Sequence, residues 1–279
     1  MTDFRSFRRV RRALAGPLLG LSAIAATAAP ASALSIQVTV ENLIPTPGIA
    51  LTPVYFGFHD DGVDLFDAGQ PASTALEVLA ELGDFGPLRD ARLAVQPGSA
   101  GGVAGPPPIQ PGQSAGFTRE IDPATQFRAS FFSMIVPTND TFIAVDLPLE
   151  LFAGDVFVGA DLLIGADGVY DAGTEDNDPT NGPAFVEGVD ATLGAVTAGG
   201  VVELESDLQG LFDSLEGLVT VVGETVVAPD VSAPGFAIAR IRIEAVDVPG
   251  AEVPLPAAAP LLLGGLGLIG VMARRRASA

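Results

Sequence analysis

The chain of 279 residues carries 34 acidic side chains and 14 arginines, with no lysine, no cysteine and a single histidine. A surface this acidic repels nucleic acid and anionic lipid, whereas it suits solubility in salt or the collection of cations. Without cysteine the fold has no disulfides, and a zinc site of thiolate or imidazole ligands is excluded.

The N-terminus has the organisation of a secretory signal peptide. Five arginines lie within the first twelve residues, an apolar run follows over residues 13–29, and Ala-Ser-Ala at 31–33 fits a signal-peptidase site. The residues around the arginine pairs fit a twin-arginine signal poorly, so the general secretory route is favoured. We therefore expect residues 1–33 to be a signal peptide and the mature protein to be exported.

Residues 34–252 are the expected folded part, with a length typical of one large domain. They contain 33 of the 34 acidic residues and six of the 14 arginines, which gives a formal charge of −27. Their first segment, residues 35–42, alternates Ile36, Val38 and Val40 with polar residues. This alternation predicts a strand with one buried face.

Residues 73–82 are the one segment with a clear helical pattern. Thr74 and Glu77 have the spacing of a capping box, and the leucines that follow lie on one stripe. Residues 98–116 are rich in glycine and proline, which predicts a loop with polyproline character. One helix is therefore expected in an early connection of the fold.

The second half of the expected domain is dominated by strand patterns. Residues 126–136 are apolar on both faces, which predicts a central strand. Shorter strands are expected at 141–146, 155–164 and 237–245. Residues 190–233 mix possible strand with a possible short helix at 208–218. Together the segments predict an all-β fold, an antiparallel β-sandwich with one short helix.

The C-terminus resembles a bacterial sorting signal. Residues 253–273 are uncharged, long enough to cross a bilayer as a helix, and three arginines follow at once. The sequence "VPLPA", the apolar run and the arginine tail resemble the VPLPA-CTERM variety of PEP-CTERM signals. The resemblance implies that residues 253–279 anchor the protein in the inner membrane until an exosortase-type protease releases it to the envelope surface or the exterior.

Two motifs that suggest hydrolysis have simpler interpretations. The sequence GQSAG at 112–116 matches Gly-x-Ser-x-Gly, but it lacks the preceding strand and following helix that a nucleophile elbow needs. His59 would have to serve any Ser–His–Asp triad, and a hydrogen-bonded structural role is favoured for it. We expect no catalytic residue in either motif.

The loop YDAGTEDND at 170–178 concentrates acidic residues. It offers four carboxylates, and Gly173 allows the backbone to curl. Calcium takes six to eight oxygen ligands from carboxylates, carbonyls and water, although the spacing is not that of an EF-hand. From the residues alone, a metal site and a solvated acidic loop are both open.

Three segments resemble spondin domains, the N-terminal modules of F-spondin-like extracellular proteins. They are GFHDDGVDLFDAGQPASTALEVLAELGD at 57–84, SMIVPTNDTFIAVD at 133–146 and YDAGTE at 170–175. The resemblance implies an eight-stranded antiparallel β-sandwich similar to C2 domains. It also implies calcium binding by Asp140, Asp171 and Glu175, although Glu175 stands where the family pattern has Asp. The animal domains carry cysteines that this chain lacks.

The sequence thus supports three hypotheses. The first is an exported, non-enzymatic calcium-binding protein with a structural, adhesive or matrix-associated role, with extracellular matrix or polysaccharide as partner. The second is a surface hydrolase of polysaccharide that uses a carboxylate pair; its candidates are Asp60, Asp61, Asp64 and Asp67. In the third, a metal is purely structural and the function lies in a loop such as 98–116.

Overall fold

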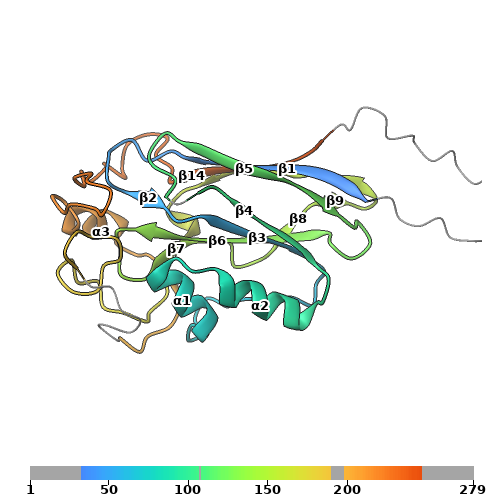
Figure 1. The fold of residues 1–279 in the computed structure, drawn as a ribbon, viewed down its shortest axis with the longest axis horizontal. Helices are drawn as coiled ribbons and strands as arrows, with labels where there is room; N and C mark the ends of the chain where they lie inside the picture. The colour runs from blue at the N-terminus through green and yellow to red at the C-terminus, as the bar shows by residue number, and fades with distance from the viewer. Residues whose placement is uncertain (1–32, 107, 190–197, 247–279) are drawn as a thin grey trace, which may run out of the picture. The chain divides into compact units, whose positions relative to one another are not determined.

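The fold is seen in a computed structural model that describes residues 33–106, 108–189 and 198–246. The expected signal peptide, apart from Ala33, and the expected C-terminal membrane helix lie outside these ranges. Within the ranges described, no helix is both long and apolar enough to span a membrane. The strands form antiparallel sheets that pack against each other, and three short α-helices accompany them (Figure 1).

The first sheet has the strand order β11–β14–β1–β5. Its strands are β11 (Ala160–Ile164), β14 (Ala239–Ala245), β1 (Leu34–Asn42) and β5 (Ser114–Ile121). The predicted alternation is confirmed in β1, where Ile36, Val38 and Val40 are fully buried. In β14, Ile241 and Ile243 point inward in the same way.

The second sheet is larger, with the order β13–β12–β7–β6–β3–β4 and two short strands added to β6. Its strands are β13 (Glu203–Leu204), β12 (Val169–Asp171), β7 (Thr141–Ile143), β6 (Arg128–Val136), β3 (Val54–His59), β4 (Ala100–Ala104), β2 (Ala50–Leu51) and β8 (Leu149–Glu150). A separate hairpin pairs β9 (Phe152–Ala153) with β10 (Val156–Phe157). The central position predicted for 126–136 is confirmed, since β6 has partners along both edges.

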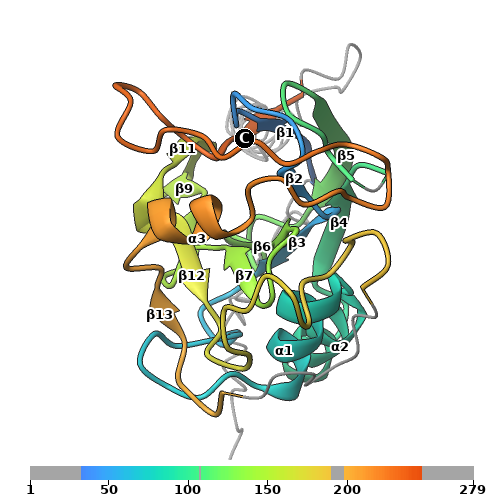
Figure 2. The same ribbon diagram turned by 90° about the vertical axis from the view of Figure 1, so that its left-hand side faces the viewer.

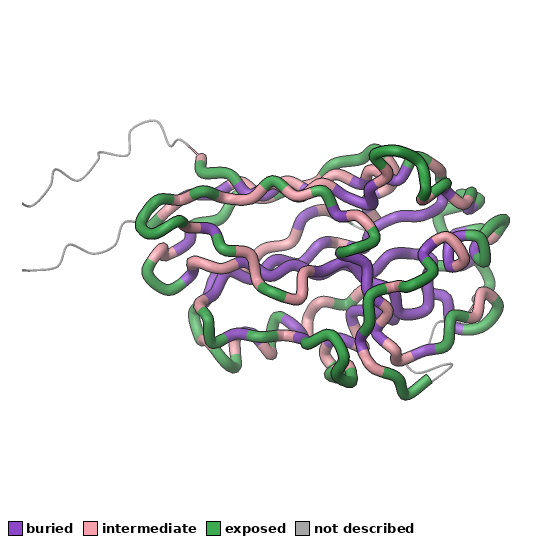
Figure 3. Tube along the Cα trace, turned by 180° about the vertical axis from the view of Figure 1, so that it is seen from behind, coloured by how far each residue is buried: buried purple, intermediate pink, exposed green. Residues whose placement is uncertain are grey.

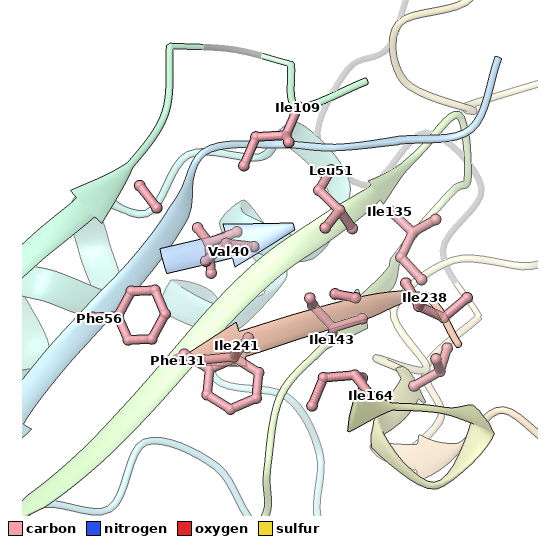
Figure 4. Close-up of a cluster of buried hydrophobic side chains, with 14 of the residues drawn as sticks. Val40, Leu51, Phe56, Ile109, Phe131, Ile135, Ile143, Ile164, Ile238 and Ile241 are labelled. Atoms are coloured by element: carbon pink, nitrogen blue, oxygen red, sulfur yellow. The ribbon is translucent and has the colours of Figure 1, made fainter. Parts of the chain in front are cut away.

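Two apolar layers hold these elements together. The main core lies between the sheets, where Phe56 and Phe131 pack with Val40 and Ile241 (Figure 4). The second lies on the other face of the larger sheet, where Phe132 packs with side chains from the two helices of residues 74–95. Figure 3 shows the result, with buried segments along the middle of the molecule and exposed segments in the outer turns. Strand β6 is apolar on both faces because each face covers a different core.

The expectation of a single helix is wrong, because the structure has α1 (Thr74–Leu82), α2 (Gly86–Val95) and α3 (Leu208–Ser214), and a short 3-10 turn η1 (Ala166–Gly168). Helix α1 is the predicted one. Its N-cap is Ser73, whose Oγ accepts from the Leu76 amide, rather than Thr74. Helix α2 was not predicted, because Gly86-Pro87 at its start is typical of a turn and its buried stripe includes an arginine. Helix α3 is the possible helix at 208–218.

The expectation of a loop over 98–116 is also wrong in part. Residues 100–104 form β4, which pairs with β3 along the edge of the larger sheet. Its two central glycines leave room for neighbours: a Cβ on Gly102 would lie 2.0 Å from the Phe117 ring, and one on Gly101 would lie 2.9 Å from Arg92 Nη2. In β4 the two glycines allow neighbouring side chains to pack closely against the strand, although glycines in a sequence usually indicate a turn.

Candidate metal centre

Two segments far apart in the sequence meet where β7 and β12 lie side by side, at the end of the sheets seen in Figure 2. Thr141 is paired with Asp171 across these strands. One residue further, the Ala172 amide donates to the Asp140 carbonyl oxygen at 3.3 Å. The strand register therefore brings the "TND" segment against the "DAGTE" loop.

Asp140 is completely buried, with 0% of its surface exposed. Its Oδ2 accepts three hydrogen bonds, from the Thr174 amide at 2.8 Å, the Thr174 hydroxyl at 3.1 Å and the Glu175 amide at 3.0 Å. Its Oδ1 is buried and has no hydrogen-bond partner among the described residues. A buried polar atom without a partner is rare and costly, so Oδ1 needs an explanation, as does the neighbouring Oγ1 of Thr141, which is buried without a partner as well.

The DAGTE loop owes its shape to Gly173. This residue has φ = 66°, and a Cβ there would lie 2.4 Å from the Val201 carbonyl oxygen. Asp171 supports the turn, since its Oδ1 accepts from the Gly173 amide at 2.6 Å and its Oδ2 from Asn177 Nδ2 at 3.2 Å. The turn aims the amides of residues 174 and 175 at Asp140.

Glu175, the third predicted ligand, is placed differently. Its backbone amide contacts Asp140, whereas its carboxylate Oε2 lies 3.3 Å from Asn139 Nδ2. Across the described part of the chain, no three acidic or histidine side chains gather closely enough to hold a metal by themselves. The structure thus brings Asp140 and Asp171 together and directs the Glu175 carboxylate towards Asn139.

The electrostatics of the pair favour a neutralising cation or proton. Burial and then the nearby charge of Asp171 raise the pKa of Asp140 to about 7, against the lowering effect of the hydrogen bonds from Thr174 and Glu175. Burial also raises the pKa of Asp171. Burial disfavours the charged form of both carboxylates, and a bound cation would stabilise that charged form.

In the outer part of the acidic loop, residues 176–181, the hydrogen bonds to the Asp178 carboxylate come from the loop itself. Asp178 accepts from the amide and hydroxyl of Thr180 at 2.8 and 2.7 Å and from Asn181 Nδ2 at 2.8 Å, and these bonds lower its pKa to about 2. Asp176 is exposed. The four acids of residues 171–178 therefore do not form one cage.

The sequence did not reveal two neutral residues of this centre. Asn139 joins the loops through its amide, which donates to the Asn181 carbonyl at 2.9 Å and accepts from the Asp178 amide at 3.2 Å. Thr174 gives two of the three donors to Asp140. The only signal for either was its place beside a carboxylate in the two motifs.

The histidine lies elsewhere, inside the larger sheet. His59 is 0% exposed, with Nδ1 2.7 Å from the Asp60 carbonyl oxygen and Nε2 2.9 Å from Ser130 Oγ. Because a carbonyl oxygen can only accept, Nδ1 donates and Nε2 accepts from the serine hydroxyl. Burial lowers the pKa of His59, so the ring is a neutral, hydrogen-bonded part of the sheet.

The acids considered for hydrolysis are only partly brought together. Asp61 forms an ion pair with Arg128. Both line a surface cavity of about 350 Å³, together with Asp64 and Glu150. Burial and then the charge of Asp67 raise the pKa of Asp64. Asp60 instead accepts from the Gly62 amide, so it supports the turn.

No model of a known protein family matches this chain. No curated protein is significantly similar to it either. The resemblance to spondin domains therefore stays a prediction that rests on the three sequence motifs.

Proposed function

We propose that this protein is an exported, non-enzymatic calcium-binding protein of the bacterial cell envelope or exterior, built on a spondin-type β-sandwich. The observation that carries the proposal is the buried Oδ1 of Asp140, which has no hydrogen-bond partner in the described part of the chain although Oδ2 of the same carboxylate accepts three hydrogen bonds. A hard cation is the ligand that such an oxygen suits.

Asp140 and Asp171 would be the charged ligands of the calcium ion. With only two carboxylates close together, neutral oxygens from the backbone, from side chains or from water would complete a shell of six to eight. Glu175 would join as a third carboxylate if its side chain turned away from Asn139. The ion would neutralise a buried charge and hold the 137–140 segment against the DAGTE loop, which makes the role of the site structural.

The setting of the domain supports a structural, adhesive or matrix-associated role. The leader-like N-terminus and the VPLPA-type C-terminus favour export, a transient anchor in the inner membrane and release by an exosortase-type protease. Extracellular calcium-binding modules work with dissociation constants of about 10⁻⁴ to 10⁻³ M. A site with two or three carboxylates suits that range.

The proposal is tested by calorimetric titration of the full-length, chelator-treated protein with calcium. One saturable site is expected, and Asp171→Asn should weaken it at least about tenfold, since a carboxylate ligand is lost. Asp176→Asn is the matched control, because it removes the same charge from an exposed position of the same loop. Equal weakening by both variants, or no saturable heat in the wild type, would refute the site.

A second candidate is the polysaccharide hydrolase. The observation that favours it is the cavity shared by Asp61 and Asp64, where Asp61 forms an ion pair with Arg128 and burial raises the pKa of Asp64. That division suits a general base and a general acid. Release of reducing ends from a polysaccharide by the wild type, but not by Asp64→Asn, would favour this function over the first.

A further inference from the structure

Positive charge is scarce in this domain, and half of it lines one cavity. Residues 34–252 contain six arginines. Arg89, Arg92 and Arg119 line a cavity of about 360 Å³ formed by α2, β3, β4 and β5, and Tyr55 and Phe85 contribute aromatic walls. In Figure 1, α2 lies along the outer face of the larger sheet, next to β3 and β4. The cavity uses none of the residues of the candidate metal centre.

Arg92 is the central cation of this cavity. It is only 2% exposed, its Nε donates to the Tyr55 hydroxyl at 2.7 Å, and its Nη1 donates to Ser99 Oγ. Every arginine ion pair between described residues involves Arg89, Arg128, Arg240 or Arg242. Although the chain has 34 acidic residues, the buried guanidinium of Arg92 forms no ion pair with a carboxylate of the described residues.

The neighbours of Arg92 orient its charge but do not neutralise it. Burial raises the pKa of Tyr55, so its hydroxyl is a neutral acceptor. The serine is neutral as well. A guanidinium has five N–H donors, and the two hydrogen bonds above use two of them. No described residue accepts a hydrogen bond from Nη2.

The sheet is shaped to admit this side chain. Gly57 and Gly101 are paired across β3 and β4. A Cβ on Gly57 would lie 2.5 Å from Arg92 Cδ, and a Cβ on Gly101 would lie 2.9 Å from Arg92 Nη2. Neither glycine has a left-handed φ, so what both positions provide is space for the guanidinium.

We propose that this cavity is a binding site for a carboxylate, sulfate or phosphate group carried on a molecule of about monosaccharide size. Arg92 would meet the oxyanion with its remaining donors, as a guanidinium does in bidentate pairs. Arg89 and the exposed Arg119 would add charge at the rim. Phe85, stacked on Tyr55 with ring centroids 5.6 Å apart, offers an apolar wall for the body of the ligand. The volume lies in the range of small-molecule pockets.

The alternative is that Arg92 only fastens α2 to the sheet, in which case the cavity binds nothing. Calorimetric titration of the full-length protein separates the two, at constant ionic strength, with sodium glucuronate, sodium sulfate and sodium phosphate as probes and glucose as the neutral match for glucuronate. We expect one saturable site for at least one anion and none for glucose. The tightest anion identifies the oxyanion. The site should persist in the presence of a calcium chelator.

The variant Arg119→Gln removes an exposed charge at the rim, so it leaves the buried hydrogen bonds intact. It should weaken anion binding by about threefold to tenfold. Arg242→Gln is the matched control, since it removes an arginine of β14 that does not line the cavity, and binding should not change. Absence of saturable binding for all three anions overturns the proposal, as does equal weakening by the two variants.

Discussion

Two regions of this molecule each bury a charge without a partner of opposite sign. At one end of the sheets, Oδ1 of Asp140 has no hydrogen-bond partner among the described residues; beside α2, Arg92 has no carboxylate partner among them. In both regions neutral groups orient the charge and a glycine makes the room, Gly173 through its backbone and Gly101 through its missing side chain. An uncompensated buried charge is strongly destabilising, which is why we propose a ligand for each region, a cation for the first and an anion for the second.

The largest predicted effect is the pH dependence of stability that arises from Asp140 in the acidic region. In the calcium-free protein the pKa of Asp140 is about 7, against about 3.9 for an unfolded Asp. The folded state therefore holds a proton that the unfolded state releases, and stability is lost as pH rises from about 4 through 7. The loss attributable to this residue is roughly 4 kcal/mol.

This dependence is measured by urea unfolding of the chelator-treated protein between pH 5 and pH 8. Asp140→Asn should flatten the curve, because the variant has no proton to lose, whereas Asp176→Asn should leave the slope unchanged. A wild-type protein that is as stable at pH 8 as at pH 5 would show that Asp140 does not carry a buried, disfavoured charge.

Gly173→Ala should produce the next largest loss. It combines a left-handed φ, which costs a residue with Cβ about 1–2 kcal/mol, with a Cβ 2.4 Å from a backbone oxygen that cannot move freely. We expect a decrease of about 3 kcal/mol in the free energy of unfolding. Gly112→Ala is the control, because Gly112 has φ = 72° and nothing within 4 Å, so it isolates the backbone contribution. Equal losses in the two variants would mean that the DAGTE loop shifts enough to relieve the contact between the added Cβ and the Val201 carbonyl oxygen.

The arginine region can be weakened through Ser99. Ser99→Ala removes the acceptor of Arg92 Nη1, and the loss of a hydrogen bond to a buried charged group costs about 2 kcal/mol. If the cavity binds an anion, saturating anion should recover more stability in the variant than in the wild type. Thermal melting with and without sodium sulfate measures both quantities, and an unchanged melting temperature would show that the serine does not support the arginine.

The smallest effect concerns a position outside both regions. Ser73→Ala should lower stability by about 1 kcal/mol through loss of the N-cap of α1, and Thr74→Ala should be nearly neutral, since Thr74 is the first helical residue. The reverse order in urea unfolding would restore Thr74 as the cap that the sequence predicted.

The parts of the fold that the sequence predicts correctly are those with a clear hydrophobic periodicity. The alternation in β1 and β14 and the double-sided apolar run of β6 placed the main strands correctly, since burial dictates these patterns. Helix α2 and strand β4 were missed partly for a shared reason. Arg92 occupies a core position of the helix, and Gly101, which makes room for it, together with Gly102, which makes room for Phe117, makes the strand resemble a loop.

The sequence predicts only part of the candidate metal centre. The sequence names the acids of the two motifs, but nothing in it shows that the amides of residues 174 and 175 donate to one oxygen of Asp140, while the other has no hydrogen-bond partner among the described residues. That asymmetry arises from the turn at Gly173 and the pairing of β7 with β12, which are properties of the folded backbone. Arg92 was hidden likewise, since its isolation from carboxylates is a matter of packing.

The most direct test of the central claim is thermal melting of the full-length protein at pH 8, with and without calcium, for the wild type and Asp140→Asn. The claim predicts that calcium at about 100 times its dissociation constant raises the wild-type midpoint by about 5–10 °C. The calcium-free variant should melt above the calcium-free wild type and should not respond to calcium. A variant that melts below the wild type, or that calcium still stabilises, would contradict the assignment of Asp140 as the cation ligand.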